Sequence, residues 1–564
     1  MASSHSWTLA SLPLLLALTG LSAGKPSPSD WDALNQAVQG RLFQGVPFAR
    51  PCFAEGFNST DCLAVRSSYV DEVARSNVAS AYIQTQWETC QTTAEGCLLS
   101  WTNPNDMSPT LPPNQCLLGS VPQYFIDVRN AQDVAEAFNF SRTTKMPLVI
   151  KNTGHDYKGR SSAPNSLALW THNLKDISYT PAFVPEGCSA ASPGVTVGAG
   201  VQWADAYAFA ESNNITLVGG SDRSVGVSGG WLQGGGHSAL SNTMGLGVDR
   251  VLQFKVVTPD GVYRTANACQ NQDLFFALRG GGGGTFGVVL ESTILASPPV
   301  TLQAVIVSFT SNTSTTQELW TILAENGLKW AEEGWGGFSQ AGIAIMINPR
   351  LSQNETATSM APLIEFGQRL QNEGVANAST VVTQFPTFGT FFNAFTAEHV
   401  SLVGTNMAEA SRMVSKDNFA TAADRSALVS ALLAADAATP GLLILLTTPY
   451  SYPSDGQTSV TDAWRSSLYH VTVVSTWEWN ATGAQKKAAY SAASASIDNL
   501  RKITPDAAYV NESDVYEPNH EVAFWGTHYA KLLQIKQKYD PDHLLDCWHC
   551  VGWDSTSPRF ACYM

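Results

Sequence analysis

The sequence has few charged residues and little positive charge. Only 14% of its 564 residues are charged, and 47 acidic side chains outnumber 32 basic ones, for a formal net charge of -15. Nucleic acids and anionic membrane surfaces are bound through clusters of Lys and Arg, so this balance argues against both as partners. With 44% hydrophobic residues, the composition is far from that of a disordered chain. We therefore expect a compact globular protein with an acidic surface.

Long hydrophobic runs are missing after the N-terminus. Residues Trp7 to Leu21 form an apolar segment, broken by Pro13, that is too short to span a bilayer and is followed by small residues. We interpret residues 1–23 as a signal peptide, although His5 stands where Lys or Arg is usual. No later stretch is apolar enough for a membrane helix. The chain is predicted to be secreted and extracellular, without a membrane partner.

Ten cysteines and eight glycosylation sequons agree with an oxidising compartment. Five cysteines precede residue 118, so at least one of them must pair with a distant segment if all ten are paired. The motif Cys547-Trp548-His549-Cys550 lacks a second ligand pair at metal spacing, which favours a structural disulfide over a zinc or redox site. No metal is expected. We expect N-glycans on part of the sequon set, which comprises Asn58, Asn139, Asn214, Asn312, Asn354, Asn377, Asn480 and Asn511.

Residues Pro147 to Leu174 contain His155, the best functional candidate in the chain. The apolar run from Leu148 to Ile150 predicts a buried strand, and the polar residues after it predict a turn that displays His155. Small residues with spare N–H groups follow, before a second predicted strand at Leu167 to Trp170. A loop able to wrap an anion is therefore expected between two strands. On His155 alone, an ordinary turn histidine is the alternative.

Two glycine runs follow this loop. Residues 226–249 read GVSGGWLQGGGHSALSNTMGLGVD, and residues 279–287 read RGGGGGTFG. Paired glycines let a backbone approach a flat ring or a pyrophosphate where a Cβ would clash. A flexible linker is the alternative, although linkers rarely contain residues such as Trp231 and Leu232. Neither run is a GxGxxG fingerprint with a trailing acidic residue, so a Rossmann site is not expected.

The rest of the chain changes character along its length. Residues 24–118 are predicted to be an extension held by disulfides, with one helix at Trp31 to Leu42. A strand pattern at Tyr124 to Val128 and a helix at Ala131 to Arg142 predict a βαβ-like entry to His155. From Val300 to about Thr504, strands and helices alternate, as in an α+β domain with an antiparallel sheet. The candidate strands are Leu302 to Phe309, Ala341 to Ile347, Leu442 to Thr448 and Tyr469 to Trp479, and the helices include Ala361 to Leu370 and Ala427 to Ala435.

The last of these strands carries aromatic residues at alternate positions. Period two places Tyr469, Trp477 and Trp479 on one face, with His470 and Glu478 on the other. Core packing is the favoured role of the aromatic side chains, and a flat wall for a sugar or aryl substrate is the alternative.

The motifs resemble, in order, those of a known family. The string KNTGHDYKGRSS at residues 151–162, both glycine runs and Tyr509-Val510-Asn511-Glu512 are similar to motifs of the secreted fungal and plant FAD-linked oxidases. These form the berberine-bridge-enzyme-like branch of the vanillyl-alcohol-oxidase superfamily. The resemblance implies an α+β fold with a two-lobed PCMH-type FAD-binding domain (119–299), a substrate-binding domain (300–505) and a C-terminal segment (506–564) that returns to the FAD-binding domain.

The resemblance also implies residue roles. His155 would bond covalently to the 8α-methyl carbon of FAD, residues 151–162 would wrap the pyrophosphate, and residues 229–238 would run beneath the isoalloxazine. Many relatives have a cysteine before the glycine pair that makes a second bond, but Arg223 or Ser224 stands there, so a single linkage is predicted. Besides His155, the expected FAD-binding residues are Lys151, Asn152, Thr153, Gly154, Asp156, Gly159, Arg160, Ser161, Ser162, Gly229, Gly230, Gly234, Gly235, Gly236, His237, Ser238, Gly245, Val248 and Asn511.

The expected base differs from that of several relatives, in which a tyrosine follows the Asn. Here Glu512 follows Asn511, and its carboxylate is the candidate proton acceptor. Tyr509, or a residue of the substrate sheet, is the alternative, with Glu512 then a solvated turn acid. We expect an oxidase that uses O2, releases H2O2 and acts on a hydroxyl of an alcohol, carbohydrate or secondary metabolite. The alternatives are a dehydrogenase on the same scaffold and a non-catalytic ligand-binding glycoprotein.

Overall fold

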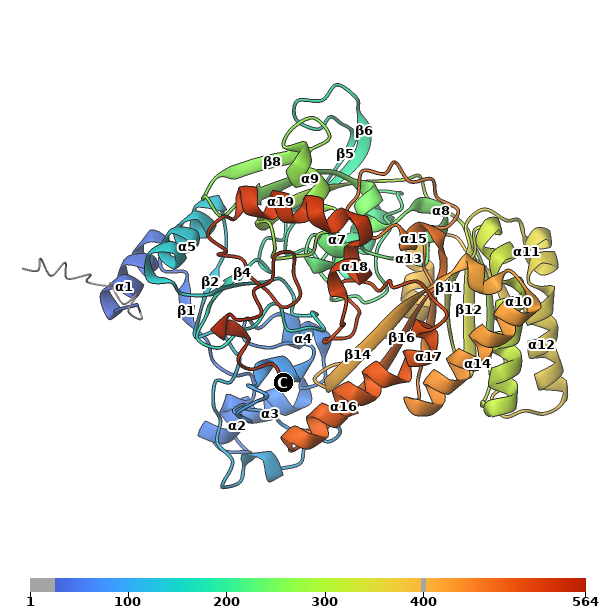
Figure 1. Ribbon diagram of the computed structural model, residues 1–564, viewed down its shortest axis with the longest axis horizontal. Coiled ribbons are helices and arrows are strands. Elements are labelled where there is room, and N and C mark those ends of the chain that lie inside the picture. Colours follow the sequence, from blue (N-terminus) through green and yellow to red (C-terminus); the bar gives the residue numbers. More distant parts are fainter. Residues whose placement is uncertain (1–25, 397–401) are drawn as a thin grey trace, which may run out of the picture.

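The computed structural model describes residues 26–396 and 402–564, so the predicted signal peptide, residues 1–23, lies outside the described residues. A four-stranded and a five-stranded sheet are built from residues 42–295, and a seven-stranded sheet from residues 302–477 (Figure 1). Helices and largely antiparallel sheets are mixed throughout. This confirms the predicted α+β class.

The N-terminal segment consists mainly of short helices. α1 (Pro28–Ala37) starts at a capping box formed by Ser27, with a proline in its first turn. The predicted helix from Trp31 to Leu42 is wrong at its C-terminal end, because the chain turns at Gly40 (φ 80°) and enters β1 (Leu42–Gln44). The other helices of the segment are α2 (Arg50–Ala54), α3 (Thr60–Ser67) and α4 (Glu72–Ser76).

The four-stranded sheet has the order β1-β2-β4-β3. β2 (Tyr124–Asp127) and β3 (Leu148–Lys151) both run parallel to β4 (Leu167–Trp170), and α5 (Ala131–Thr144) connects β2 to β3. The predicted strand, helix and strand are confirmed, but β4 lies between the two strands in the sheet. Residues 152–162, which we call the His155 loop, leave the carboxyl end of β3.

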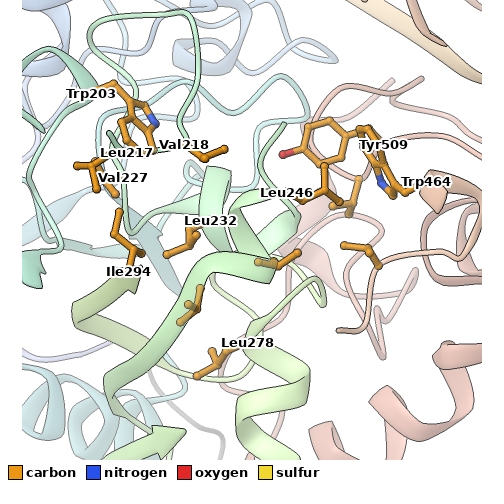
Figure 2. Packing of buried hydrophobic residues seen from close by; sticks show 14 of the residues in the cluster. Trp203, Leu217, Val218, Val227, Leu232, Leu246, Leu278, Ile294, Trp464 and Tyr509 are labelled. Carbon is orange, nitrogen blue, oxygen red and sulfur yellow. The ribbon is translucent and has the colours of Figure 1, made fainter. Parts of the chain in front are cut away.

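The five-stranded sheet is antiparallel and is made of β5 (Ile177–Phe183), β6 (Ser192–Gly198), β9 (Val288–Leu295), β7 (Val251–Val257) and β8 (Tyr263–Asn267), in that order. The first glycine run is not a flexible linker, because it folds into α7 (Gly230–Gly234), α8 (Ser241–Met244) and a 3-10 turn. These turns, α6 (Trp203–Ser212) and α9 (Gln272–Leu278) pack with the sheet into a first core. Figure 2 shows that Tyr509 and Trp464, from the second half of the chain, complete this core.

The seven-stranded sheet confirms the predicted antiparallel sheet of the second half. Its order is β13 (Ser379–Phe385), β10 (Leu302–Ser308), β12 (Ile343–Asn348), β11 (Gly336–Gln340), β15 (Leu443–Leu446), β16 (Ser467–Trp477) and β14 (Asn406–Ser415). Alternate residues serve different cores: Ala304 and Ile306 join the first core, whereas Val305 and Val307 join a second core beneath the helices. Those helices include α10 (Thr313–Glu333), α12 (Ala361–Asn372), α14 (Ala422–Ala438) and α16 (Gly483–Ser496). The shorter helices of this half are α11 (Gln353–Ser359), α13 (Phe388–Phe391), α15 (Ala463–Ser466) and α17 (Asp498–Arg501).

Strand β16 separates a packing face from a polar face. Tyr469 and Trp477 are 1% and 7% exposed and belong to the second core, so the favoured packing role is confirmed for both. The strand ends at Trp477, and Glu478 therefore lies beyond it, where its carboxylate accepts hydrogen bonds from residues of the N-terminal segment. His470 is on the opposite face, toward the first core.

The C-terminal segment contains α18 (His520–Trp525) and α19 (Tyr529–Tyr539) and returns to the N-terminal half (Figure 1). All ten cysteines form disulfides. The pair Cys90–Cys562 supplies the predicted tie to a distant segment, and Cys547–Cys550 is the predicted structural bridge. The remaining pairs are Cys52–Cys62, Cys97–Cys116 and Cys188–Cys269. Within residues 26–396 and 402–564, none of the helices has the length and apolar character needed to cross a membrane.

Candidate functional site

A cavity opens where the His155 loop, the two glycine runs and the C-terminal segment meet. It encloses about 1280 Å³, its open mouth included. The lining residues fall within four stretches, 150–161, 220–237, 283–289 and 509–512, together with Thr171. Segments hundreds of residues apart in the sequence therefore build one site.

The His155 loop is held from behind by the N-terminal segment. The Ile83 N–H donates to the Gly154 carbonyl (3.0 Å), and the Trp87 indole N–H donates to the Tyr157 carbonyl (3.1 Å). Gly159 has φ 74°, and a Cβ added there would lie 2.3 Å from the Trp87 ring. The loop keeps its shape because its carbonyls and its glycine fit this surface.

The C-terminus holds the same loop. The Tyr563 hydroxyl donates to the Lys158 carbonyl at 2.6 Å, one residue after the disulfide at Cys562. The buried Lys158 Nζ donates to Ser513 Oγ (3.1 Å) and lies 4.0 Å from the centre of the Phe524 ring. Residues of the N-terminal segment and of the C-terminal segment therefore fix the backbone that carries His155.

His155 faces the cavity with its imidazole 12% exposed. Its Nε2 lies 2.6 Å from Ser224 Oγ and 3.7 Å from Asp222 Oδ1. Burial lowers the pKa of His155, although the charges of Asp222 and Glu72 oppose the shift. At neutral pH the imidazole is therefore uncharged and has a free lone pair.

The glycine runs form part of the cavity floor. A Cβ at Gly226 would lie 1.9 Å from Asn152 Oδ1, and a Cβ at Gly283 would lie 2.9 Å from the Gly230 Cα. Gly230 itself has open space on the side where a Cβ would stand. The backbone is therefore packed closely at Gly226 and Gly283 and open at Gly230, which leaves room there for a flat ligand.

Tyr509 and Asn511 fasten the first glycine run. The Gly236 N–H and Asn511 Nδ2 both donate to the Tyr509 hydroxyl oxygen, at 3.1 and 2.7 Å. Asn511 Nδ2 also donates to the Gly230 carbonyl (2.8 Å). Burial raises the pKa of the Tyr509 phenol, and the Glu512 charge adds to the effect.

Glu512 lies between two histidines at the cavity wall. His237 Nε2 donates to Glu512 Oε1 (3.1 Å), and His470 Nε2 donates to Glu512 Oε2 (2.9 Å). Burial raises the pKa of Glu512, but the charge and hydrogen bonds of His237 and His470 outweigh it and leave the pKa below its ordinary value. The three ligand-type side chains lie within 4.8 Å of one another, a spacing that hydrogen bonding accounts for. The site thus presents an ionised carboxylate joined to two imidazoles.

A second carboxyl group lies behind this cluster. Glu409 of β14 is 6% exposed, and its Oε2 has no hydrogen-bond partner among the described residues. Burial and the charge of Glu512 raise the pKa of Glu409 well above its ordinary value. The two pKa shifts run in opposite directions: burial favours the neutral form of Glu409, whereas the hydrogen bonds from His237 and His470 favour the ionised form of Glu512.

Several polar atoms at the cavity wall are buried and lack a hydrogen-bond partner among the described residues. They are Asn152 Oδ1, Arg160 Nη1, Ser161 Oγ, Asp222 Oδ2 and Gln233 Oε1. Native proteins pair nearly all buried polar groups, so a polar ligand is expected to satisfy this set.

Comparison with known proteins agrees with that expectation. Residues 122–267 match the family model described as FAD binding domain, and residues 508–547 match the model described as berberine and berberine like. The chain is 37% identical over 593 aligned positions to the FAD-linked oxidoreductase ffsJ of Aspergillus flavipes, covering 97% of this chain and 95% of the relative. The chain belongs to the berberine-bridge-enzyme-like FAD-linked oxidoreductases. It is also 36% identical to the FAD-linked oxidoreductase cheF of Chaetomium globosum, covering 96% and 89% of the two chains.

The fold of this oxidoreductase is shared by a solved structure. The VAO-type flavoprotein MtVAO615 of Myceliophthora thermophila C1 superposes with a TM-score of 0.82 at 27% identity, covering 95% of this chain and 96% of that one. The predicted PCMH-type family is therefore confirmed.

FAD fits the residues that line the cavity. Arg160 Nη1 and Ser161 Oγ are hydrogen-bond donors on the His155 loop, which suits an anionic pyrophosphate. The open backbone at Gly230 suits a flat ring system. The loop and the glycine runs would thus hold the cofactor.

The predicted cofactor residues divide into two groups. Those that line the cavity are Asn152, Thr153, Gly154, His155, Asp156, Arg160, Ser161, Gly229, Gly230, His237 and Asn511. Those that lie behind the lining are Lys151, Gly159, Ser162, Gly234, Gly235, Gly236, Ser238, Gly245 and Val248. Lys151 points away from the cavity, since its Nζ donates to the Val78 carbonyl (2.7 Å).

Four residues of this oxidoreductase site were not predicted to be functional from the sequence: His470, Asp222, Ser224 and Glu409. A signal existed for His470, because period two placed it on the face opposite the packed aromatic residues. Ser224 was named in the sequence analysis only because it stands near the position where many relatives have a second flavin-linking cysteine. Asp222 and Glu409 gave no sequence signal, because their importance depends on burial.

Proposed function

We propose that this oxidoreductase carries FAD on a single covalent bond to His155 and oxidises a hydroxyl group of a small molecule, with O2 as the electron acceptor. The substrate class is an alcohol, a carbohydrate or a secondary metabolite. Bound FAD would supply the acceptor for a hydride from the substrate carbon. One observation carries the proposal: His155 and the Glu512 cluster stand on walls of the same cavity.

Glu512 accepts the hydroxyl proton of the substrate. Its carboxylate is ionised and reaches the cavity, and its hydrogen bonds to His237 and His470 fix its orientation. The proton neutralises the carboxylate, and the two imidazoles that are hydrogen-bonded to it can share that proton. Tyr509 is less suited to this role, because its oxygen already accepts two hydrogen bonds and its raised pKa disfavours the phenolate.

The disulfides support a single linkage. All ten cysteines are paired with one another, and none lines the cavity. His155 is uncharged, which is the form that acts as a nucleophile. The five disulfides, together with exposed asparagines in seven of the eight sequons, also support secretion and N-glycosylation.

A visible spectrum of the purified protein, followed by acid precipitation, tests the proposal. We expect yellow flavin to stay in the precipitate of the wild type and to appear in the supernatant of His155→Ala. Alcohols and sugars are then screened for H2O2 release. A colourless protein would refute the proposal; turnover with an artificial acceptor but without H2O2 would identify a dehydrogenase.

A further inference from the structure

His155 belongs to a short hydrogen-bonded chain that the oxidation reaction does not use. The Ser224 hydroxyl donates to Asp222 Oδ1 (3.1 Å), and the Ser224 backbone N–H donates to the same oxygen (2.9 Å). Asp222 and Ser224 are 9% and 1% exposed. The aspartate therefore fixes the rotamer of the serine.

This chain selects the tautomer of His155. Because the Ser224 proton points to Asp222, the Ser224 oxygen accepts a hydrogen bond from His155 Nε2 (2.6 Å). The proton of the neutral imidazole is thus on Nε2, and the lone pair is on Nδ1. A hydrogen bond to one imidazole nitrogen commonly sets the role of the other.

A second feature points to proton transfer along the chain. Asp222 Oδ2 is buried at the cavity wall and has no hydrogen-bond partner among the described residues. Arg223, the nearest cation in sequence, pairs instead with Glu72 (3.3 Å). The Asp222 carboxylate therefore keeps one oxygen, Oδ2, free of protein hydrogen bonds within the described residues, while Oδ1 accepts from Ser224.

We propose that Asp222, acting through Ser224, positions His155 for the covalent bond to FAD and accepts the proton that the imidazole loses when this bond forms. Asp222 and Ser224 are positioning residues in this scheme, and His155 is the nucleophile. The inference rests on the proposed histidyl linkage and assigns Asp222 and Ser224 as the residues that promote formation of that bond.

The atoms and electrons of the step balance. The bond that forms joins His155 Nδ1 to the 8α-carbon, and the bonds that break are one C–H of the 8α-methyl group and the N–H at Nε2. The Nε2 proton passes to Ser224 Oγ as the Ser224 proton passes to Asp222. Two electrons and two protons are finally transferred to O2, which gives H2O2. The imidazole ends neutral, with its Nε2 lone pair facing the Ser224 hydroxyl.

Covalent flavin content of the full-length chain, rather than turnover, is the measured quantity. Ser224→Ala and Asp222→Asn proteins are purified, incubated with FAD in air, and sampled over hours for flavin that stays in the acid precipitate. We expect both variants to bind flavin that acid releases, and to form the covalent bond at least tenfold more slowly than the wild type. Ser224→Thr keeps the hydroxyl and is expected to restore the bond.

Controls separate this inference from the proposed function. Asp205→Asn makes the same charge change on an exposed residue of α6 and is expected to flavinylate like the wild type. Covalent flavin formed at the wild-type rate in both Ser224→Ala and Asp222→Asn would overturn the relay and leave the linkage intact. A wild type without covalent flavin would overturn the linkage itself. If Asp222→Asn does not fold, the Ser224→Ala and Ser224→Thr pair decides the question.

Discussion

Replacing Glu512 by Gln tests the acid–base chemistry most directly. The substitution keeps the side-chain volume but removes the negative charge of the carboxylate, whose oxygens accept hydrogen bonds from His237 and His470 (3.1 and 2.9 Å). One of these imidazoles must then face an amide NH2 group. A positioned general base contributes roughly 10²–10⁴-fold in rate, which corresponds to about 3–5 kcal/mol of transition-state stabilisation. We expect kcat to fall by that factor.

The assay is anaerobic stopped-flow measurement of flavin reduction with the best alcohol or sugar found in the screen. The visible spectrum and the covalent flavin content should be unchanged, since the attachment residue is untouched. Glu325→Gln, on the exposed face of α10, is the matched control and should reduce at the wild-type rate. If the rate of flavin reduction in Glu512→Gln stays within about threefold of the wild-type rate, Glu512 is not the base, because loss of the base would slow proton transfer far more.

Three further predictions concern glycosylation, acid stability and the terminal disulfide. Asn511 is expected to carry no glycan in glycopeptide mass spectra, because its Nδ2 donates to the Gly230 carbonyl, whereas the other seven sequon asparagines are exposed. Burial lowers the pKa of His549 to about 2 in the folded protein, against about 6.5 in the unfolded chain. As the pH falls below about 6.5, only the unfolded chain gains a proton at His549, so the stability of the fold falls. His549→Asn should reduce the fall in Tm between pH 6.5 and 4. An unchanged slope of Tm against pH would contradict a contribution of His549 to acid sensitivity. Replacing Cys90 and Cys562 by Ser should destabilise the chain by about 2–5 kcal/mol, measured by chemical unfolding, and an unchanged midpoint would show that the tail needs no covalent tie.

Local patterns were sufficient to predict much of the fold. Strand β3, the His155 loop and β4 were expected because an apolar run, a polar turn and another apolar run are each decided by neighbouring residues. The same holds for α5 and for most strands of the large sheet. The error at Leu42 has a local cause as well, since the positive φ of Gly40 ends the helical pattern early.

Only those site residues that belong to a recognisable sequence motif could be predicted. His155 and Glu512 were found through their neighbours in sequence, but the partners that determine their chemistry come from other elements. His470 reaches Glu512 from β16, and Asp222 reaches His155 from the segment before the first glycine run. Their proximity depends on sheet register and loop packing, which the composition of a single segment does not encode.

The position of the C-terminus has a consequence for the order of events during synthesis. The backbone that presents His155 is held on one side by Ile83 and Trp87 and on the other by Tyr563, which lies far later in the sequence. Ile83 and Trp87 are therefore synthesised long before Tyr563, and the loop lacks its second support until that residue has been made. The disulfide from Cys90 to Cys562 then ties this late support to the segment that carries the early ones.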